Sequence, residues 1–292
     1  MSAMREFVLD TAFGTLAGLR AGREGAPKVL ALHGWLDNAA SFVPLSPHLP
    51  DVDLVAIDMP GHGASAHLPI VADYLLLAFV RSAFAAADAL GWERFALLGH
   101  SLGGVIASLM ASAQPRRIER LLTIEALGAL TEAEERTTQR LRDALTAYRA
   151  LPRKQLRVFP DIETAVRARL QGGTGDLGEA AARLLVERGL RPVRPGEGDA
   201  GFVWRSDPRL TMPTAVRMSE GQSRDLVAHI ECPVRVIYAD PAQSYFPDAL
   251  RRERAALLPR GELIVMPGSH HLHMDDAVGV AAAIGDFFAR AA

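Results

Sequence analysis

The sequence has few of the residues that mark several large classes of protein. It contains one cysteine among 292 residues, so it cannot form an intramolecular disulfide. That residue, Cys232, stands just ahead of an apolar run, a position that disfavours a catalytic thiol. Only Lys28 and Lys154 are lysines among the 32 basic residues, and the formal net charge is −2. This balance gives no broad attraction to nucleic acid or to an anionic membrane, so we expect neither as a partner.

Long uninterrupted apolar runs are also missing. The most apolar stretch, from Tyr74 to Leu90, is interrupted by Arg81 and Asp88, which predicts a buried amphipathic helix and not a membrane span. The first ten residues, MSAMREFVLD, have no apolar run after a basic patch, so no secretion signal is visible. We therefore expect a cytoplasmic protein that acts on a small molecule. The sequence gives no indication of an oligomeric state.

Short aliphatic runs alternate with helical stretches along most of the chain. Hydrophobic residues make up 49% of the sequence and charged residues 23%, so a sizeable core can form. Runs that are apolar throughout are typical of parallel strands covered by helices on both faces. We therefore predict an α/β fold with a mostly parallel, doubly wound sheet. The runs lie at 29–32, 54–57, 95–98, 121–124, 234–238 and 263–266, with helices such as 71–91 and 102–113 between them.

One interval breaks this alternation. The residues between the run ending at Ile124 and the run beginning at Val234 have helical periodicity and little strand signal. This predicts a helical cap at 127–229, inserted into a core formed by 1–126 and 230–292. Within the cap, the segment from Thr131 to Glu134 has the form of a capping box at a helix start.

The strongest motif is Gly99-His100-Ser101-Leu102-Gly103, an instance of G-x-S-x-G between an apolar strand and an apolar helix. A tight strand-to-helix turn lifts the serine hydroxyl clear of the sheet, and glycines at both ends make room for the turn. The helix that follows directs backbone N–H groups toward a negative charge. This context indicates that Ser101 is a nucleophile.

Three segments together resemble the α/β-hydrolase family. His33-Gly34-Trp35 resembles the family's oxyanion loop, 58–63 its structural turn after the next strand, and 99–103 its nucleophile elbow. The stretch 33–42 is similar to the serine-hydrolase-like branch, which neighbours the capped epoxide hydrolases and haloalkane dehalogenases. The fold implied is an α/β-hydrolase core with an inserted helical cap.

The resemblance implies an oxyanion hole formed by the backbone amides of Trp35 and Leu102. Fixed donors of this kind stabilise the negative charge on the carbonyl oxygen during acyl transfer. Dehalogenases and epoxide hydrolases of this fold use an aspartate at the elbow, where this chain has Ser101. The serine therefore favours cleavage of an ester, thioester or amide through an acyl-enzyme.

A serine hydroxyl needs a general base, and histidine is the usual one. Of nine histidines, those after the last aliphatic run are best placed, in Gly268-Ser269-His270-His271-Leu272-His273. The family's catalytic histidine has an acidic residue five positions later, which His270 and Asp275 match. His271 is the adjacent competitor, and only one of two neighbouring side chains can face the elbow.

Two carboxylates could orient the histidine, because each ends an aliphatic run and precedes it in the chain. Glu125 follows the run at 121–124 and resembles the position used by some dehalogenases. Asp240 follows the run at 234–238, near the commonest family position, but the usual spacing there would place the acid at Ala242. We favour Glu125 slightly and keep Asp240 as the alternative.

Two residues are candidates for the substrate pocket. Trp204 lies in a cap segment that mixes aromatics with charges, although aromatic residues more often pack than bind. His100 stands inside the elbow, where a structural hydrogen bond is the alternative role. The clustered histidines have no partner cysteine or carboxylate at metal-ligand spacing, so we expect no metal and no cofactor.

The sequence therefore predicts a serine hydrolase that cleaves an ester of a small, apolar substrate. Ser101 would attack, His270 would transfer the proton, and Glu125 or Asp240 would orient the imidazole. Two other functions remain open. One is a non-catalytic ligand-binding relative, and the other is cofactor-free perhydrolysis or carbon–carbon bond hydrolysis by the same triad.

Overall fold

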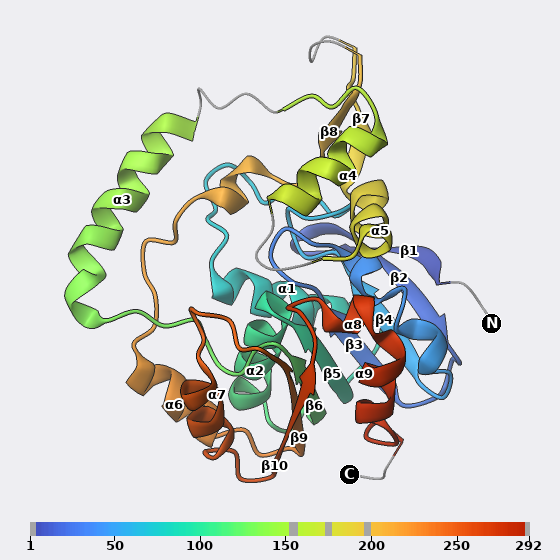
Figure 1. The fold of residues 1–292 in the computed structure, drawn as a ribbon, viewed down its shortest axis with the longest axis vertical. Helices are drawn as coiled ribbons and strands as arrows, with labels where there is room; N and C mark the ends of the chain where they lie inside the picture. Colours follow the sequence, from blue (N-terminus) through green and yellow to red (C-terminus); the bar gives the residue numbers. More distant parts are fainter. Residues whose placement is uncertain (1–3, 152–156, 173–176, 196–199, 290–292) are drawn as a thin grey trace.

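A mostly parallel eight-stranded sheet forms the centre of the molecule (Figure 1). The computed structural model describes residues 4–151, 157–172, 177–195 and 200–289. The strand order is β1-β2-β4-β3-β5-β6-β9-β10; β2 runs antiparallel to β1 and β4, and the other pairs are parallel. The strands are β1 (Arg5–Thr11), β2 (Gly14–Gly22), β3 (Lys28–Leu32), β4 (Asp53–Ile57), β5 (Phe95–His100), β6 (Ile118–Ile124), β9 (Val234–Asp240) and β10 (Gly261–Pro267).

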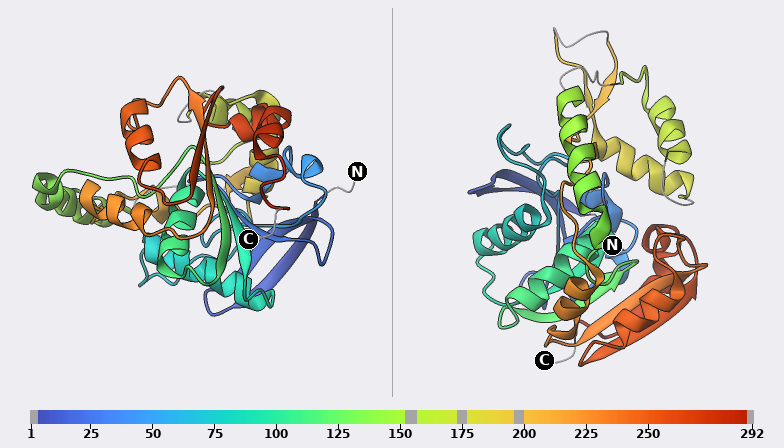
Figure 2. Two further views of the ribbon diagram at one scale, coloured as in Figure 1. Left: turned by 90° about the horizontal axis from the view of Figure 1, so that it is seen from below. Right: turned by 90° about the vertical axis from the view of Figure 1, so that its left-hand side faces the viewer.

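The inner strands are apolar on both faces because helices cover both sides of the sheet. In β3, Leu30 and Leu32 pack in the cluster that holds α1 and α2, whereas Val29 and Ala31 pack in the cluster that holds α9. Figure 2 shows these helices on opposite sides of the sheet. The core helices are α1 (Leu76–Ala89), α2 (Leu102–Ala113), α7 (Asp248–Ala255), α8 (Leu272–Asp275) and α9 (Ala277–Ile284), with the 3₁₀ turns η1 (Ala39–Phe42) and η2 (Ser46–His48).

The predicted fold class is confirmed. Each of the six predicted aliphatic runs forms a strand of the sheet, and the residues before the first run form the antiparallel pair β1 and β2. The helix predicted at 71–91 begins only at Leu76. Before it, the Tyr74 hydroxyl accepts a hydrogen bond from the Leu68 amide and donates one to Asp207, which holds this segment as a loop.

The insertion between β6 and β9 contains two helical parts of different character. Helices α4 and α5 share a small apolar core with the hairpin β7–β8, whereas α3 stands apart in Figure 1 and buries only Ala144 of its fourteen residues. The elements are η3 (Glu134–Arg136), α3 (Thr137–Ala150), α4 (Ile162–Gln171), α5 (Glu179–Gly189), β7 (Leu190–Pro192), β8 (Phe202–Trp204), η5 (Pro208–Thr211) and α6 (Glu220–Ala228). The predicted range 127–229 thus includes a hairpin as well as helices.

Two local details of the cap differ from the prediction. The capping box at Thr131 is wrong: α3 is preceded by η3, which starts at Glu134, and the Thr131 hydroxyl donates to Glu220 Oε2. A capping box does occur further along, where Ser219 and Gln222 satisfy the start of α6. Helix α6 lies within 127–229 but packs on the core, because Val227 belongs to the cluster that holds α2. Among the described residues, no helix is long and apolar enough to cross a membrane.

Candidate active site

Ser101 occupies a sharp turn between β5 and α2. Its backbone has φ 50° and ψ −118°, in a region that non-glycine residues rarely adopt. A side chain on Gly103 would overlap the Leu32 carbonyl oxygen, and one on Gly99 would overlap the Gly103 carbonyl group. The two glycines therefore permit the close approach that the turn requires. Ser101 itself stays partly exposed, so its hydroxyl is accessible.

Three side chains form one hydrogen-bonded series at this turn. The Ser101 Oγ lies 3.0 Å from His270 Nε2, and His270 Nδ1 lies 3.1 Å from Glu125 Oε2. A carboxylate can only accept, so Nδ1 carries the imidazole proton and Nε2 presents its lone pair to the serine hydroxyl. His270 is buried and Glu125 is buried, which strengthens the interaction between them. The arrangement has the donor and acceptor pattern of a serine–histidine–carboxylate triad.

Glu125 is fixed at both of its carboxylate oxygens. It is the residue after β6 and has φ 59°, which turns its side chain back toward the neighbouring strand β9. The Ala239 amide donates to Oε1 at 2.6 Å, and the Arg251 guanidinium donates to Oε2 at 3.2 Å. Because both oxygens have partners besides His270, the carboxylate cannot rotate away from the imidazole without breaking several bonds.

Arg251 was not found from the sequence, although it is among the largest fully buried side chains. It also donates to the backbone carbonyl groups of Ala239 and Phe246, and it lies over the Tyr238 ring at 4.5 Å from the centroid. A buried guanidinium with this many acceptors is rigidly held, so it supplies a fixed positive charge behind Glu125.

Asp240 lies elsewhere. It is the exposed last residue of β9, and its backbone carbonyl accepts a hydrogen bond from Gly268. Within the described residues, no hydrogen bond or ion pair joins its side chain to His270. The structure thus brings Glu125, and not Asp240, to the imidazole.

The two proposed oxyanion donors lie at the start of α2 and in the turn after β3. Leu102 is the first residue of α2, so its N–H has no acceptor within the helix. Trp35 precedes Leu36, which has φ 59° in the turn after β3. In the part of the chain that the structure describes, neither amide donates a hydrogen bond. The two amides are therefore available to an external acceptor.

Both predicted pocket residues have other surroundings. His100 has no exposed surface and its Nε2 donates to the His270 backbone carbonyl at 2.8 Å, so it does not line an open pocket. Trp204 packs inside the cap, edge-on to Phe159 with 5.6 Å between ring centroids. We correct the assignment of His100, which supports the histidine loop; Trp204 is partly buried against the cap's own core, and its role in the pocket stays a prediction. The Trp35 indole, which is 48% exposed, donates to the Leu210 carbonyl.

Burial keeps two other histidines near the site neutral. Burial lowers the pKa of His100 well below its usual range and lowers the pKa of His273 to about 3. His271 is buried beside Asp37, with His271 Nε2 3.2 Å from Asp37 Oδ2. In the described structure, the Ser101 hydroxyl is hydrogen-bonded to His270 and to none of these three histidines, so they do not compete with His270 as its base.

One group of the described residues has ligand atoms close enough to hold a metal ion. The atoms of Asp37, His100 and His271 lie within 4.8 Å of one another, and all three residues are buried. However, Arg169 donates to the other oxygen of Asp37 at 2.7 Å, and His271 already directs an N–H at this carboxylate. A guanidinium this near opposes a second cation, so a hydrogen-bonded ion pair explains the group better.

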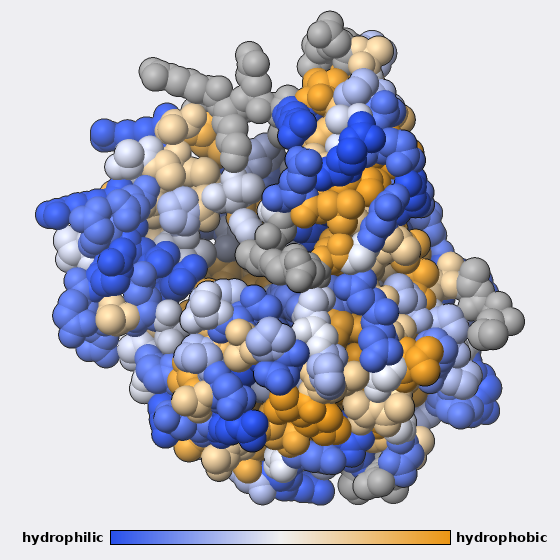
Figure 3. Space-filling model, in the orientation of Figure 1, coloured by the Kyte–Doolittle hydropathy of each residue, from blue (hydrophilic) through white to orange (hydrophobic). Residues whose placement is uncertain are grey.

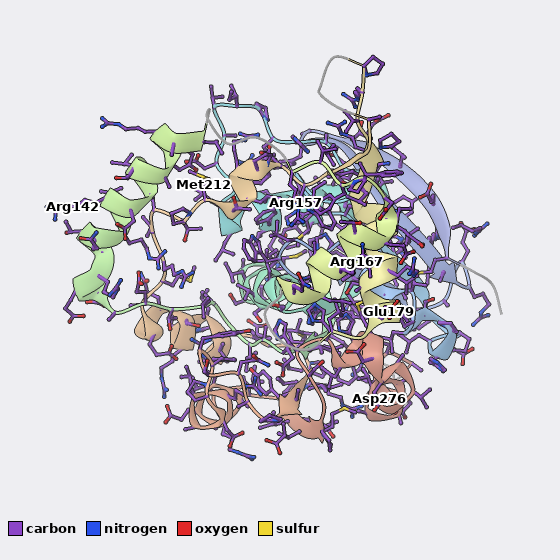
Figure 4. The ribbon with its side chains drawn as sticks, turned by 45° about the horizontal axis from the view of Figure 1, so that its top comes forward. Arg142, Arg157, Arg167, Glu179, Met212 and Asp276 are labelled. Atoms are coloured by element: carbon purple, nitrogen blue, oxygen red, sulfur yellow. The ribbon has the colours of Figure 1, made fainter. Side chains whose placement is uncertain are left out.

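A hollow opens between α3 and α4 (Figure 3). Apolar residues also pack close to the nucleophile: Val105, one turn after Ser101 in α2, clusters with Ala126, Ala129 and the partly buried Met218. Figure 4 places Met212 on the side of η5 that faces α3, and Arg142 on the outer side of α3. Uncharged side chains therefore pack one helical turn from the serine, and Arg142 points away from the hollow.

Comparison with known proteins gives consistent matches. The family model described as the alpha/beta hydrolase fold matches residues 27–277. The human serine hydrolase-like protein 2 is 31% identical over 97% of this chain and 93% of its own length. A solved structure of a hypothetical protein from Pseudomonas aeruginosa is 40% identical, with a TM-score of 0.89 over 99% of this chain and all of that one. The thioesterase domain from the curacin biosynthetic pathway is 25% identical, with a TM-score of 0.80 over 97% of this chain and 99% of that one.

Proposed function

The chain belongs to the α/β-hydrolase family, and we propose that it is a serine hydrolase that cleaves an ester, thioester or amide through an acyl-enzyme. The observation that carries this proposal is the continuous series from Ser101 to His270 to Glu125, with both imidazole nitrogens engaged. The strained elbow at Ser101 supports it as well, because strain of this kind concentrates at functional sites.

The geometry supports the following sequence of steps. Ser101 Oγ attacks the carbonyl carbon while its proton moves to His270 Nε2, and Glu125 stabilises the imidazolium that forms. The carbonyl π-electron pair moves to the oxygen, where the amides of Trp35 and Leu102 donate to it, each contributing roughly 3 kcal/mol in comparable sites. Collapse of the intermediate expels the leaving group, which takes the proton from Nε2.

The acyl-enzyme is then hydrolysed by the same groups. A water molecule gives a proton to His270 Nε2 as its oxygen attacks the acyl carbon. A second tetrahedral intermediate collapses, the proton returns to Ser101 Oγ, and the carboxylic acid leaves. Apart from the substrate and this water molecule, the groups that act in these steps all belong to the chain.

An apolar acyl group suits the surroundings of the nucleophile best. A small cluster of uncharged side chains, Val105, Ala126, Ala129 and the partly buried Met218, packs one helical turn from Ser101, and this favours an apolar acyl group. Burial of apolar substrate surface there would contribute about 25 cal/mol per Å². The similarity to a thioesterase domain supports thioesters as well as oxygen esters among the substrates.

Labelling with a fluorophosphonate, followed by intact-mass analysis, tests the proposal. We expect one adduct per chain on the wild type, none on Ser101→Ala, and labelling slowed at least 100-fold on His270→Ala. Ser244→Ala, which removes an exposed serine, is the matched control and labels like the wild type. A well-folded wild type that no fluorophosphonate labels, small probes included, would contradict the proposal and favour a ligand-binding role.

A substrate panel then identifies the bond. The purified protein is assayed with p-nitrophenyl esters of two to ten carbons, matching acyl thioesters, and a diketone. Turnover that rises with acyl length supports the apolar pocket. Turnover of the diketone alone would mean that the protein hydrolyses a carbon–carbon bond and not an ester.

A further inference from the structure

Three histidines that follow β10 contact three different parts of the core. His270 reaches the elbow at Ser101, His271 reaches Asp37, and His273 Nε2 lies 2.6 Å from the hydroxyl of Ser41 in η1. Asp37 and Ser41 both belong to the segment that follows the Trp35 amide. The histidine loop and the oxyanion loop are therefore joined by two buried side-chain contacts.

Asp37 is the centre of this junction. Burial opposes its ionisation, but the hydrogen bond from His271 and the charge of Arg169 hold the pKa of the Asp37 carboxyl well below its usual range. The ionised carboxylate can only accept, so His271 Nε2 carries the proton and donates. One carboxylate oxygen of Asp37 thus accepts from His271 and the other accepts from Arg169.

The position of Asp37 in the chain connects it to the proposed oxyanion hole. It comes two residues after Trp35, and its backbone amide donates to the Gly34 carbonyl at 3.2 Å. This closes a four-residue turn that contains the Trp35 N–H. A side chain that is held at both oxygens therefore also restrains the turn and the direction of that N–H.

Arg169 comes from the cap and not from the core. It lies in the last turn of α4, and its side chain is 17% exposed. The adjoining helix α5 makes two more contacts with the same part of the core. The Leu185 carbonyl accepts from Asn38 Nδ2, and Arg188 pairs with the fully buried Asp58. The α4–α5 unit is thus docked on the oxyanion loop.

We propose that Asp37 and Arg169 are positioning residues that make the alignment of His270 and of the Trp35 amide depend on the docking of α4. The proposal rests on the hydrolase function proposed above. Neither residue contacts the Ser101 hydroxyl, and each acts through the junction of the two loops. When Arg169 is removed, Asp37 loses the partner that holds its second oxygen, and both loops gain freedom.

The test compares two arginines of the cap by steady-state kinetics on one chromogenic ester. Arg169→Met lowers kcat about 10- to 100-fold, the size that small misalignments produce, while KM stays within about threefold. Arg169→Lys restores most of kcat, because it returns the charge to Asp37. The control is Arg183→Met, which removes a pair between Arg183 and Glu163 inside the cap and leaves kcat unchanged.

Two results would overturn the inference. Equal kcat for Arg169→Met and Arg183→Met would show that the junction does not align the site. A rise in KM at constant kcat would make Arg169 a substrate contact instead. If Arg169→Met does not fold, Asp37→Asn serves in its place, since the amide oxygen still accepts from His271 while the charge pair is lost. Wild-type labelling by a fluorophosphonate is read in parallel, so a failed hydrolase assignment is recognised separately from a failed inference.

Discussion

Two neighbouring histidines in this protein have nearly the same surroundings and different chemistry. His270 and His271 each face a buried carboxylate, Glu125 and Asp37, and each carboxylate has an arginine behind it. The pairs differ at the far nitrogen. His270 Nε2 meets a partly exposed serine hydroxyl, whereas His271 Nδ1 has no partner among the described residues.

A histidine–carboxylate pair therefore does not by itself identify a candidate catalytic site. What decides the role is the group beyond the imidazole and its access to substrate. The arginines differ too: Arg251 comes from α7 of the core and Arg169 from α4 of the cap. The first pair is thus built entirely within the core, and the second extends into the cap.

The largest expected effect separates the two carboxylates. Glu125→Gln lowers kcat about 10⁴-fold, because an amide neither fixes the required tautomer nor stabilises the imidazolium. Asp37→Asn lowers it only about 10- to 100-fold, because it acts through alignment. Steady-state kinetics on the same ester measures both. Losses of equal size would mean that the two pairs share the catalytic role.

The next effect compares the arginines through stability. Arg251→Met leaves Glu125 buried without its cation and lowers the free energy of unfolding by about 3–5 kcal/mol. The loss for Arg169→Met is smaller, because water reaches its partly exposed side chain. Urea unfolding at neutral pH measures both values. In Arg251→Lys, which keeps the charge, at least half of the loss is recovered; no recovery would assign the effect to packing.

A third prediction concerns two buried, neutral histidines of the core, His62 and His273. Burial lowers the pKa values of His62 and His273 to about 3, below the value of about 6.5 that each has when unfolded. The unfolded chain therefore binds protons first, so stability is full above pH 6.5 and falls as the pH drops toward 3. Each such histidine adds about 1.4 kcal/mol per pH unit to this slope.

Urea unfolding between pH 6 and 4 checks the slope. His273→Asn makes it shallower by about the share of one histidine, 1.4 kcal/mol per pH unit. Replacement of the exposed His48 by asparagine leaves the slope as in the wild type and serves as the control. Parallel slopes for His273→Asn and the wild type would show that His273 already binds a proton in the folded state.

The smallest effect is expected at Asp240, the alternative acid of the sequence analysis. Asp240→Asn keeps kcat within about twofold of the wild type, because its side chain has no contact with His270 in the described structure. The isosteric change also preserves the backbone carbonyl that accepts from Gly268. A loss comparable to that of Glu125→Gln would transfer the orienting role to Asp240.

Much of the fold could be predicted because its strands are short, apolar and regularly spaced. The elbow could be predicted for a similar reason, since Gly99, Ser101 and Gly103 are adjacent in sequence. The choice between Glu125 and Asp240 could not be settled in this way. Both stand at the carboxyl end of a strand, and only the hydrogen bond between His270 Nδ1 and Glu125 Oε2 in the folded chain shows which side chain meets the imidazole.

Contacts between distant residues were beyond the sequence. Arg251 and Arg169 are two of many arginines, and they meet carboxylates 126 and 132 positions away. Thr131 resembled a helix cap because nothing local reveals its bond to Glu220. The sequence likewise does not show that Trp204 packs against Phe159, because helices α4 and α5 separate the two residues along the chain.

The place of Glu125 in the chain also bears on how new specificities could be obtained by recombination. The three residues of the proposed triad and the two proposed oxyanion amides lie outside 127–219, the segment that precedes the core-packed helix α6. A chimera that exchanges this segment for that of a relative would keep all five groups of the proposed site and carry a different cap over them. If the donor segment lacks an arginine equivalent to Arg169, the chimera would accept new substrates and process them slowly.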